Sequence, residues 1–113
     1  MPGPLAVTYL FNRTCPSHEE GLRLLHEAAV RACIEVDVTV REVIDDEEAV
    51  RLGFPGSPTY LVAGRDVAPT IEGAPYAAES CRVYRRPGGR FGPLPHIDDL
   101  VRALTESQQE AAA

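Results

Sequence analysis

The sequence predicts a small α/β domain in which a mixed sheet of four strands is flanked by helices. Three observations favour this class. The length of 113 residues suits one hydrophobic core, since single domains cluster near about 100–150 residues. The composition, 44% hydrophobic and 25% charged, is that of a folded chain rather than a disordered one. Strand-like and helix-like apolar patterns alternate along the chain, in the order β-α-β-α-β-β-α.

The first half of the chain contains two predicted strands, each followed by a predicted helix. Residues 5–11 are nearly all apolar and rich in β-forming residues, which is typical of a strand covered on both faces. Residues 16–33 carry apolar side chains at helical spacing. Residues 36–41 alternate valine with polar residues, as a half-exposed edge strand does. The acidic cluster at 45–48 and Gly53 bound a short helix, because carboxylates favour a helix start and glycine follows a helix end.

The second half of the chain is more often interrupted by proline and glycine. Its predicted elements are a strand at 59–63, a long connection at 66–80, a strand at 80–85 and a closing helix that includes residues 97–104. We expect residues 1–113 to form a single domain, with its core at about 5–105 and a frayed tail at 106–113.

Composition and charge exclude several classes of function. Lys and Arg number 11 against 17 Asp and Glu, so the net charge of −6 leaves no basic surface for nucleic-acid phosphates. The longest apolar run, at 5–11, is far shorter than the roughly 20 residues that span a bilayer. The N-terminal residues lack the positive charge that begins a secretory signal. We therefore expect a cytoplasmic protein with no nucleic-acid or membrane partner.

The cysteines argue against a disulfide or metal scaffold. The chain has three, Cys15, Cys33 and Cys81, and an odd number suits no fully paired set of disulfides. No two of them have the two-residue spacing of a zinc ribbon or knuckle. We accordingly expect no metal and no cofactor. Cys33 continues the apolar stripe of the helix predicted at 16–33, and we expect it in the core.

Cys15 is the candidate nucleophile, because it lies in a polar turn between a predicted buried strand and a predicted helix. Unpaired N–H groups and the dipole of a helix start stabilise an anion, so we expect the Cys15 pKa below its usual value of about 8.5. Pro16 is compatible with a first helical turn. His18 lies about one helical turn from the thiol, where an imidazole would stabilise a thiolate or accept the thiol proton.

Cys81 lies in the strand predicted at 80–85, and two roles stay open for it. It is either an inert strand residue or a resolving thiol that attacks an oxidised or mixed-disulfide form of Cys15. The second role requires the two Cα atoms to come within about 7 Å.

Two short motifs carry a resemblance to a known family. The TCPSH sequence at 14–18 follows the first predicted strand, and GSPT at 56–59 opens a later one. Together they resemble the thioredoxin superfamily, and GRD at 64–66 with SCRVYR at 80–85 is similar to small bacterial thioredoxin-like proteins often labelled as relatives of alkylmercury lyase. The resemblance covers about residues 5–104.

The resemblance implies a thioredoxin-like fold and a thiol site. The Ser57–Pro58 bond is expected to be cis, with the proline packed against the active-site cysteine and helping to bind extended thiol or peptide substrates. The expected substrate-binding residues are Pro16, Ser57, Pro58 and Thr59.

The motif departs from redox-active thioredoxins in one position. Those proteins carry Cys-x-x-Cys, whereas this chain has histidine at position 18 and so reads Cys-x-x-His. The motif cannot close its own disulfide. It retains monothiol chemistry, in which Cys15 forms a mixed disulfide with a low-molecular-weight thiol or a protein, resolved externally or by Cys81.

Two other functions compete with monothiol chemistry. The fold is compatible with a non-catalytic binding or accessory module in a biosynthetic or stress pathway, because fold alone does not assign function. The alkylmercury lyase label implies instead that Cys15 and Cys81 coordinate a soft metal as thiolates while an acid protonates the carbon–metal bond.

Overall fold

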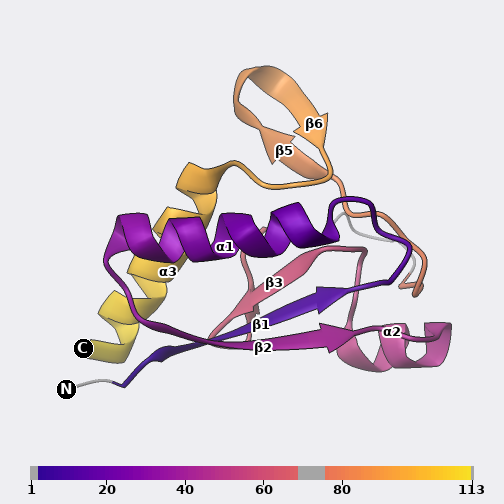
Figure 1. Cartoon of the computed structure of the whole chain (residues 1–113), viewed down its shortest axis with the longest axis horizontal. Coiled ribbons are helices and arrows are strands. Elements are labelled where there is room, and N and C mark those ends of the chain that lie inside the picture. Colours follow the sequence, from indigo (N-terminus) through magenta and orange to yellow (C-terminus); the bar gives the residue numbers. More distant parts are fainter. Residues whose placement is uncertain (1–2, 69–75, 113) are drawn as a thin grey trace.

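A four-stranded mixed sheet and three helices make up most of this computed structural model, which describes residues 3–68 and 76–112 (Figure 1). The strands lie in the order β2-β1-β3-β4. Their bounds are Leu5–Phe11 for β1, Val36–Glu42 for β2, Thr59–Val62 for β3 and Arg65–Asp66 for β4. The helices are α1 at His18–Ala32, α2 at Asp46–Leu52 and α3 at Ile97–Ala112. The predicted α/β class is confirmed.

β1 lies in the middle of the sheet, with β2 on one side and β3 on the other. It runs parallel to β2, with Leu5 opposite Val36, and antiparallel to β3, with Tyr9 opposite Tyr60. The parallel pair requires a crossover, which α1 supplies. β2 is the edge strand that its alternating sequence indicates.

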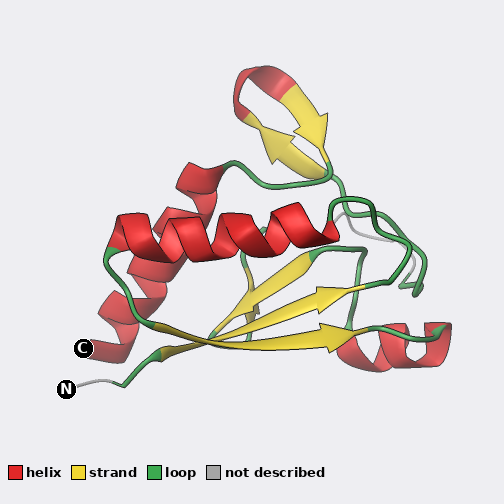
Figure 2. Ribbon diagram, viewed as in Figure 1, coloured by secondary structure: helices red, strands yellow, loops and turns green. Residues whose placement is uncertain are grey.

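The core occupies both faces of β1, as its nearly unbroken apolar sequence predicts. Successive side chains of a strand point to opposite faces. Val7 and Tyr9 pack with residues of α1 and α3, which lie over the same face (Figure 2). Leu10 points the other way and packs with Ala49 of α2 and with Phe54. The end of β1 is therefore held between two buried clusters, and the turn that follows it starts from a fixed position.

Local capping explains the ends of the first two helices. The Asp45 side chain accepts a hydrogen bond from the Glu48 N–H at the start of α2, and Gly53 follows its end with φ +65°. Cys33 ends α1 in the left-handed conformation, φ +54°. Because the chain leaves the helix there, Cys33 departs from the apolar stripe and is exposed. The prediction that Cys33 belongs to the core is wrong.

The second half of the chain differs most from its sequence prediction. The fourth strand of the sheet is β4, which pairs with β3 through a tight turn at Ala63 and Gly64, both at positive φ. Of the stretch predicted as a strand at 80–85, residues 80–83 form only an isolated bridge at Cys81. Its last residues belong to β5, Tyr84–Arg86, which pairs with β6, Arg90–Gly92, in a separate hairpin that projects from the body of the domain (Figure 1).

Two further differences concern the long connection and the C-terminus. Of the connection predicted at 66–80, residues 69–75 lie outside the described part of the chain. α3 continues to Ala112, through most of the predicted tail at 106–113. No helix in the described ranges is both long and apolar enough to cross a bilayer.

Candidate functional site

Cys15 lies in the turn between β1 and α1, and its side chain is partly buried. Two backbone hydrogen bonds shape the turn: Cys15 N–H donates to Asn12 O at 3.1 Å, and His18 N–H donates to Cys15 O at 3.4 Å. The Cys15 thiol lies 3.8 Å from the carbonyl oxygen of Ser57, to which it donates a weak hydrogen bond. The thiol therefore faces the turn that precedes β3, as the resemblance implies.

The neighbour of the sulfur differs from the expectation drawn from the sequence. The cysteine is expected where amide N–H groups converge, yet the hydrogen bond of the Cys15 side chain is to an acceptor, the Ser57 carbonyl. The physical reason is the position of the helix start. Ser17 is the N-cap and α1 begins at His18, so Cys15 precedes the first free N–H groups of the helix.

The turn before β3 is fixed by hydrogen bonds to the end of β1. Its Ser57–Pro58 peptide bond is cis, as predicted. The Ser57 hydroxyl accepts from the Asn12 N–H at 3.1 Å, and the Thr59 hydroxyl donates to Gly56 O at 2.6 Å. These contacts hold the Ser57 carbonyl beside the Cys15 turn.

The segment that contains Cys81 pairs with this turn through backbone hydrogen bonds. Ser57 N–H donates to Ser80 O at 2.9 Å, and Arg82 N–H donates to Ser57 O at 3.1 Å, so Ser57 and Cys81 form a parallel bridge. Gly56 permits the approach, because a Cβ there would lie 2.6 Å from the Arg82 nitrogen. The structure thus brings Cys15 and Cys81, both candidate thiols, to the same residue. The Cys81 side chain is exposed.

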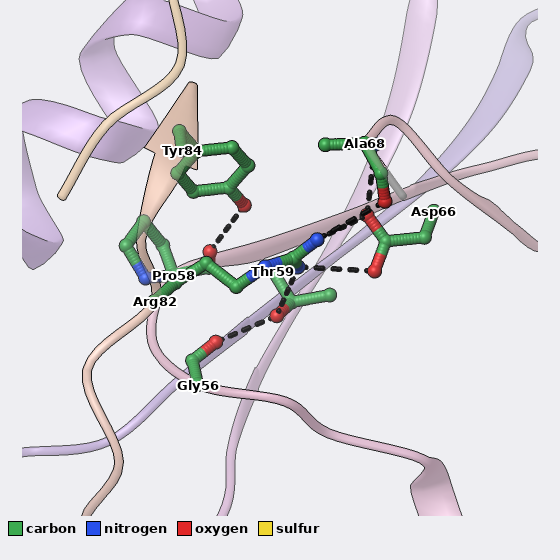
Figure 3. A network of polar contacts seen from close by, with 7 residues as sticks. All are labelled: Gly56, Pro58, Thr59, Asp66, Ala68, Arg82 and Tyr84. Atoms are coloured by element: carbon green, nitrogen blue, oxygen red, sulfur yellow. Dashed lines mark hydrogen bonds and ion pairs between the residues drawn. The ribbon is translucent and has the colours of Figure 1, made fainter. Parts of the chain in front are cut away.

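Arg82 fixes this segment to the sheet (Figure 3). Its side chain is 4% exposed and forms two hydrogen bonds of 3.0 Å with the Asp66 carboxylate. It also donates to the Thr59 hydroxyl and to Ala68 O, each at 3.1 Å, and its guanidinium lies 4.7 Å from the centre of the Tyr84 ring. The sequence carries no local signal for this role, because nothing near Arg82 distinguishes it from an exposed strand arginine.

The residues expected to bind substrate have mostly internal positions. Ser57, Pro58 and Thr59 are buried, the first and last through side-chain hydrogen bonds within the chain. Pro16 is exposed beside Cys15. The role of these four residues in substrate binding stays a prediction, and in this structure Pro16 alone of the four has an exposed side chain.

The His18 side chain packs against Phe11 rather than bonding to the Cys15 thiol through Nδ1. Its imidazole stacks on Phe11, with the ring centres 3.7 Å apart and the planes 6° from parallel. Its Nδ1 atom is buried and has no hydrogen-bond partner, so this atom makes no bond with Cys15. The geometry gives His18 a packing role at the start of α1.

Two buried tyrosines tie the first turn of α1 to the sheet below Cys15. Tyr9 donates from its hydroxyl to His18 O at 2.6 Å, and Tyr60 donates to Gly21 O at 2.8 Å. Burial raises the pKa of both phenols far above the usual value of about 10. Both tyrosines therefore remain neutral donors, and they hold the helix start in place.

The described residues enclose a cavity of about 730 Å³. It is bounded by the β5–β6 hairpin, by residues 67–68 and by α3, and its apolar lining includes Val83 and Phe91, which are 56% and 64% exposed. This volume is within the usual range for a small-molecule pocket, roughly 300–1,000 Å³. Neither cysteine of the candidate site lines it.

Comparison of the chain with protein-family models, with curated proteins and with solved structures gives no match.

Proposed function

We propose that this protein has a thioredoxin-like fold and acts as a monothiol redox or thiol-transfer protein, with Cys15 as the nucleophile. The observation that carries the proposal is the contact between the Cys15 thiol and the Ser57 carbonyl, beside the cis Ser57–Pro58 bond. A partly buried thiol in a turn held by backbone hydrogen bonds suits a group that reacts in a defined orientation.

The reaction follows ordinary thiol–disulfide exchange. Cys15 loses its proton to solvent, and the thiolate attacks one sulfur of a disulfide. The disulfide bond breaks, a new bond forms at Cys15, and the departing thiolate takes up a proton. The product is a mixed disulfide, which a second thiol releases by the same reaction in reverse.

The backbone around Ser57 favours a low-molecular-weight thiol over an extended peptide as the partner. A peptide that adds as a strand needs free N–H and C=O groups on the strand it joins. Both groups of Ser57 are already bonded to the chain itself, through Ser80 and Arg82. A small thiol needs access only to the sulfur.

A glutathione-dependent transfer assay tests the proposal. Reduction of the mixed disulfide between glutathione and 2-mercaptoethanol is followed for the unsubstituted protein, Cys15→Ser and Cys33→Ser. We expect Cys15→Ser to lose catalysis and Cys33→Ser to retain it, because Cys33 is exposed at the far end of α1. Equal rates for the two variants would contradict the proposal.

The cavity supports a second candidate, a non-catalytic binding or accessory module. Its size and the exposed Val83 and Phe91 in its lining suit a small, largely apolar ligand. The two functions are distinguished by binding measured with a panel of small apolar molecules. If Phe91→Ser abolishes binding and Cys15→Ala does not, the binding function is independent of the thiol.

A further inference from the structure

The Cys15 thiol and the backbone next to Cys81 both contact the carbonyl group of Ser57. The Ser57 carbonyl oxygen accepts the Arg82 N–H at 3.1 Å and lies 3.8 Å from the Cys15 thiol. Arg82 directly follows Cys81 in the chain, and Cys81 itself is paired with Ser57 in the parallel bridge. Both cysteines therefore lie beside the same residue, Ser57, although they are far apart in sequence.

The remaining cysteine is excluded from this neighbourhood by the length of α1. Cys15 lies before the first residue of the helix and Cys33 lies just after its last, with 15 helical residues between them. At 1.5 Å per residue, the helix separates them by roughly 20 Å. Of the other two cysteines, Cys81 is the one that shares the neighbour Ser57 with Cys15.

The two thiols also differ in exposure, in the way that a sequential reaction needs. Cys15 is partly buried and donates to Ser57 O, whereas Cys81 is exposed. Arg82 anchors the backbone beside Cys81 through Asp66, Thr59 and Ala68, so the segment stays near the site while the Cys81 side chain is free to turn.

We propose that Cys81 is the built-in resolving thiol of Cys15, an inference that rests on the proposed function. Cys15 first exchanges with a low-molecular-weight disulfide and forms a mixed disulfide, releasing one small thiol. Cys81 then loses its proton to solvent, and its thiolate attacks the Cys15 sulfur. The bond to the second small thiol breaks, and that thiolate leaves and is protonated. In sum, one small disulfide is reduced to two thiols while Cys15 and Cys81 are oxidised to one disulfide.

Mass spectrometry of the full chain after reaction with glutathione disulfide tests this assignment. All variants carry Cys33→Ser, so that only the two site thiols remain. With Cys81 present, we expect a protein about two mass units lighter, with no glutathione attached. With Cys81→Ser, we expect one glutathione on Cys15. The adduct should be at least about tenfold longer-lived in Cys81→Ser, since a tethered thiol acts at millimolar or higher effective concentration.

The possible failures are distinguishable. If the Cys81→Ser protein forms the adduct and the protein with Cys81 keeps an equally stable one, the resolving role is overturned while the reactive Cys15 stands. If Cys81→Ser forms no adduct, the proposed function fails, and the resolving role fails with it. Cys81 has an exposed side chain, so its replacement by serine leaves the buried contacts of the segment unchanged.

Discussion

Replacement of Asp66 by alanine tests the anchor that holds the Cys81 segment beside Ser57. The substitution leaves the Arg82 guanidinium, 4% exposed, without its carboxylate and without two hydrogen bonds of 3.0 Å. Removing one partner of a buried ion pair costs about 3–5 kcal/mol. The Asp66 side chain is 22% exposed, which lets water reach the vacated position, so we expect the lower end, about 3 kcal/mol.

Urea unfolding at neutral pH measures this loss, with Arg65→Ala as the matched control. Arg65 is the neighbour of Asp66 in β4, and its ion pair with Glu110 is exposed on both sides, at 73% and 57%. Exposed pairs contribute at most about 1 kcal/mol. Losses that agree within about 1 kcal/mol for the two variants would refute the idea that Arg82 and Asp66 form a buried anchor. The Asp66 variant should also slow closure between Cys15 and Cys81 more than it slows adduct formation on Cys15.

Three further predictions concern Gly21, the buried tyrosines and His18. Gly21→Ala should destabilise the fold by about 1–3 kcal/mol in urea unfolding, because its Cβ would lie 2.6 Å from the Tyr9 hydroxyl. If adding Tyr9→Phe restores none of the lost stability, the clash with this hydroxyl is not the cause. Burial raises the folded-state pKa of Tyr9, Tyr60 and Tyr84, so above about pH 10 only the unfolded chain loses these protons. The free energy of unfolding should therefore fall as pH rises above about 10, by up to about 1.4 kcal/mol per pH unit for each tyrosine. Denaturant unfolding across this pH range should show a shallower fall for Tyr84→Phe, and an unchanged slope would refute the assignment. His18→Phe should preserve stacking on Phe11 and keep thiol transfer within about threefold, and a loss above tenfold would show that the imidazole takes part in the reaction.

The elements that sequence analysis predicted well are those set by local pattern. The apolar run of β1 and the alternation of β2 reflect burial on two faces and on an edge, and both signals lie within the element itself. The short helix α2 is bounded by its own capping residues, Asp45 and Gly53. The proximity of Cys15 to the Ser57 turn followed from the family resemblance rather than from any local signal.

The features that sequence analysis did not predict depend on contacts between distant parts of the chain. β4 has two residues and exists because β3 turns back on itself at Ala63 and Gly64. Arg82 is buried only because Asp66 and Thr59 supply acceptors for it. The pairing of residues 80–82 with the Ser57 turn also depends on contacts between distant parts of the chain. It places Cys81 beside Ser57.

The reaction rate of each cysteine with glutathione disulfide shows whether Cys15 is the nucleophile of this protein. Three single-cysteine proteins are compared at the same pH, retaining Cys15, Cys33 or Cys81. We expect the protein retaining Cys15 to form its mixed disulfide fastest, although Cys15 is the most buried of the three. A rate for Cys15 equal to or below that of exposed Cys33 would contradict its role as the nucleophile.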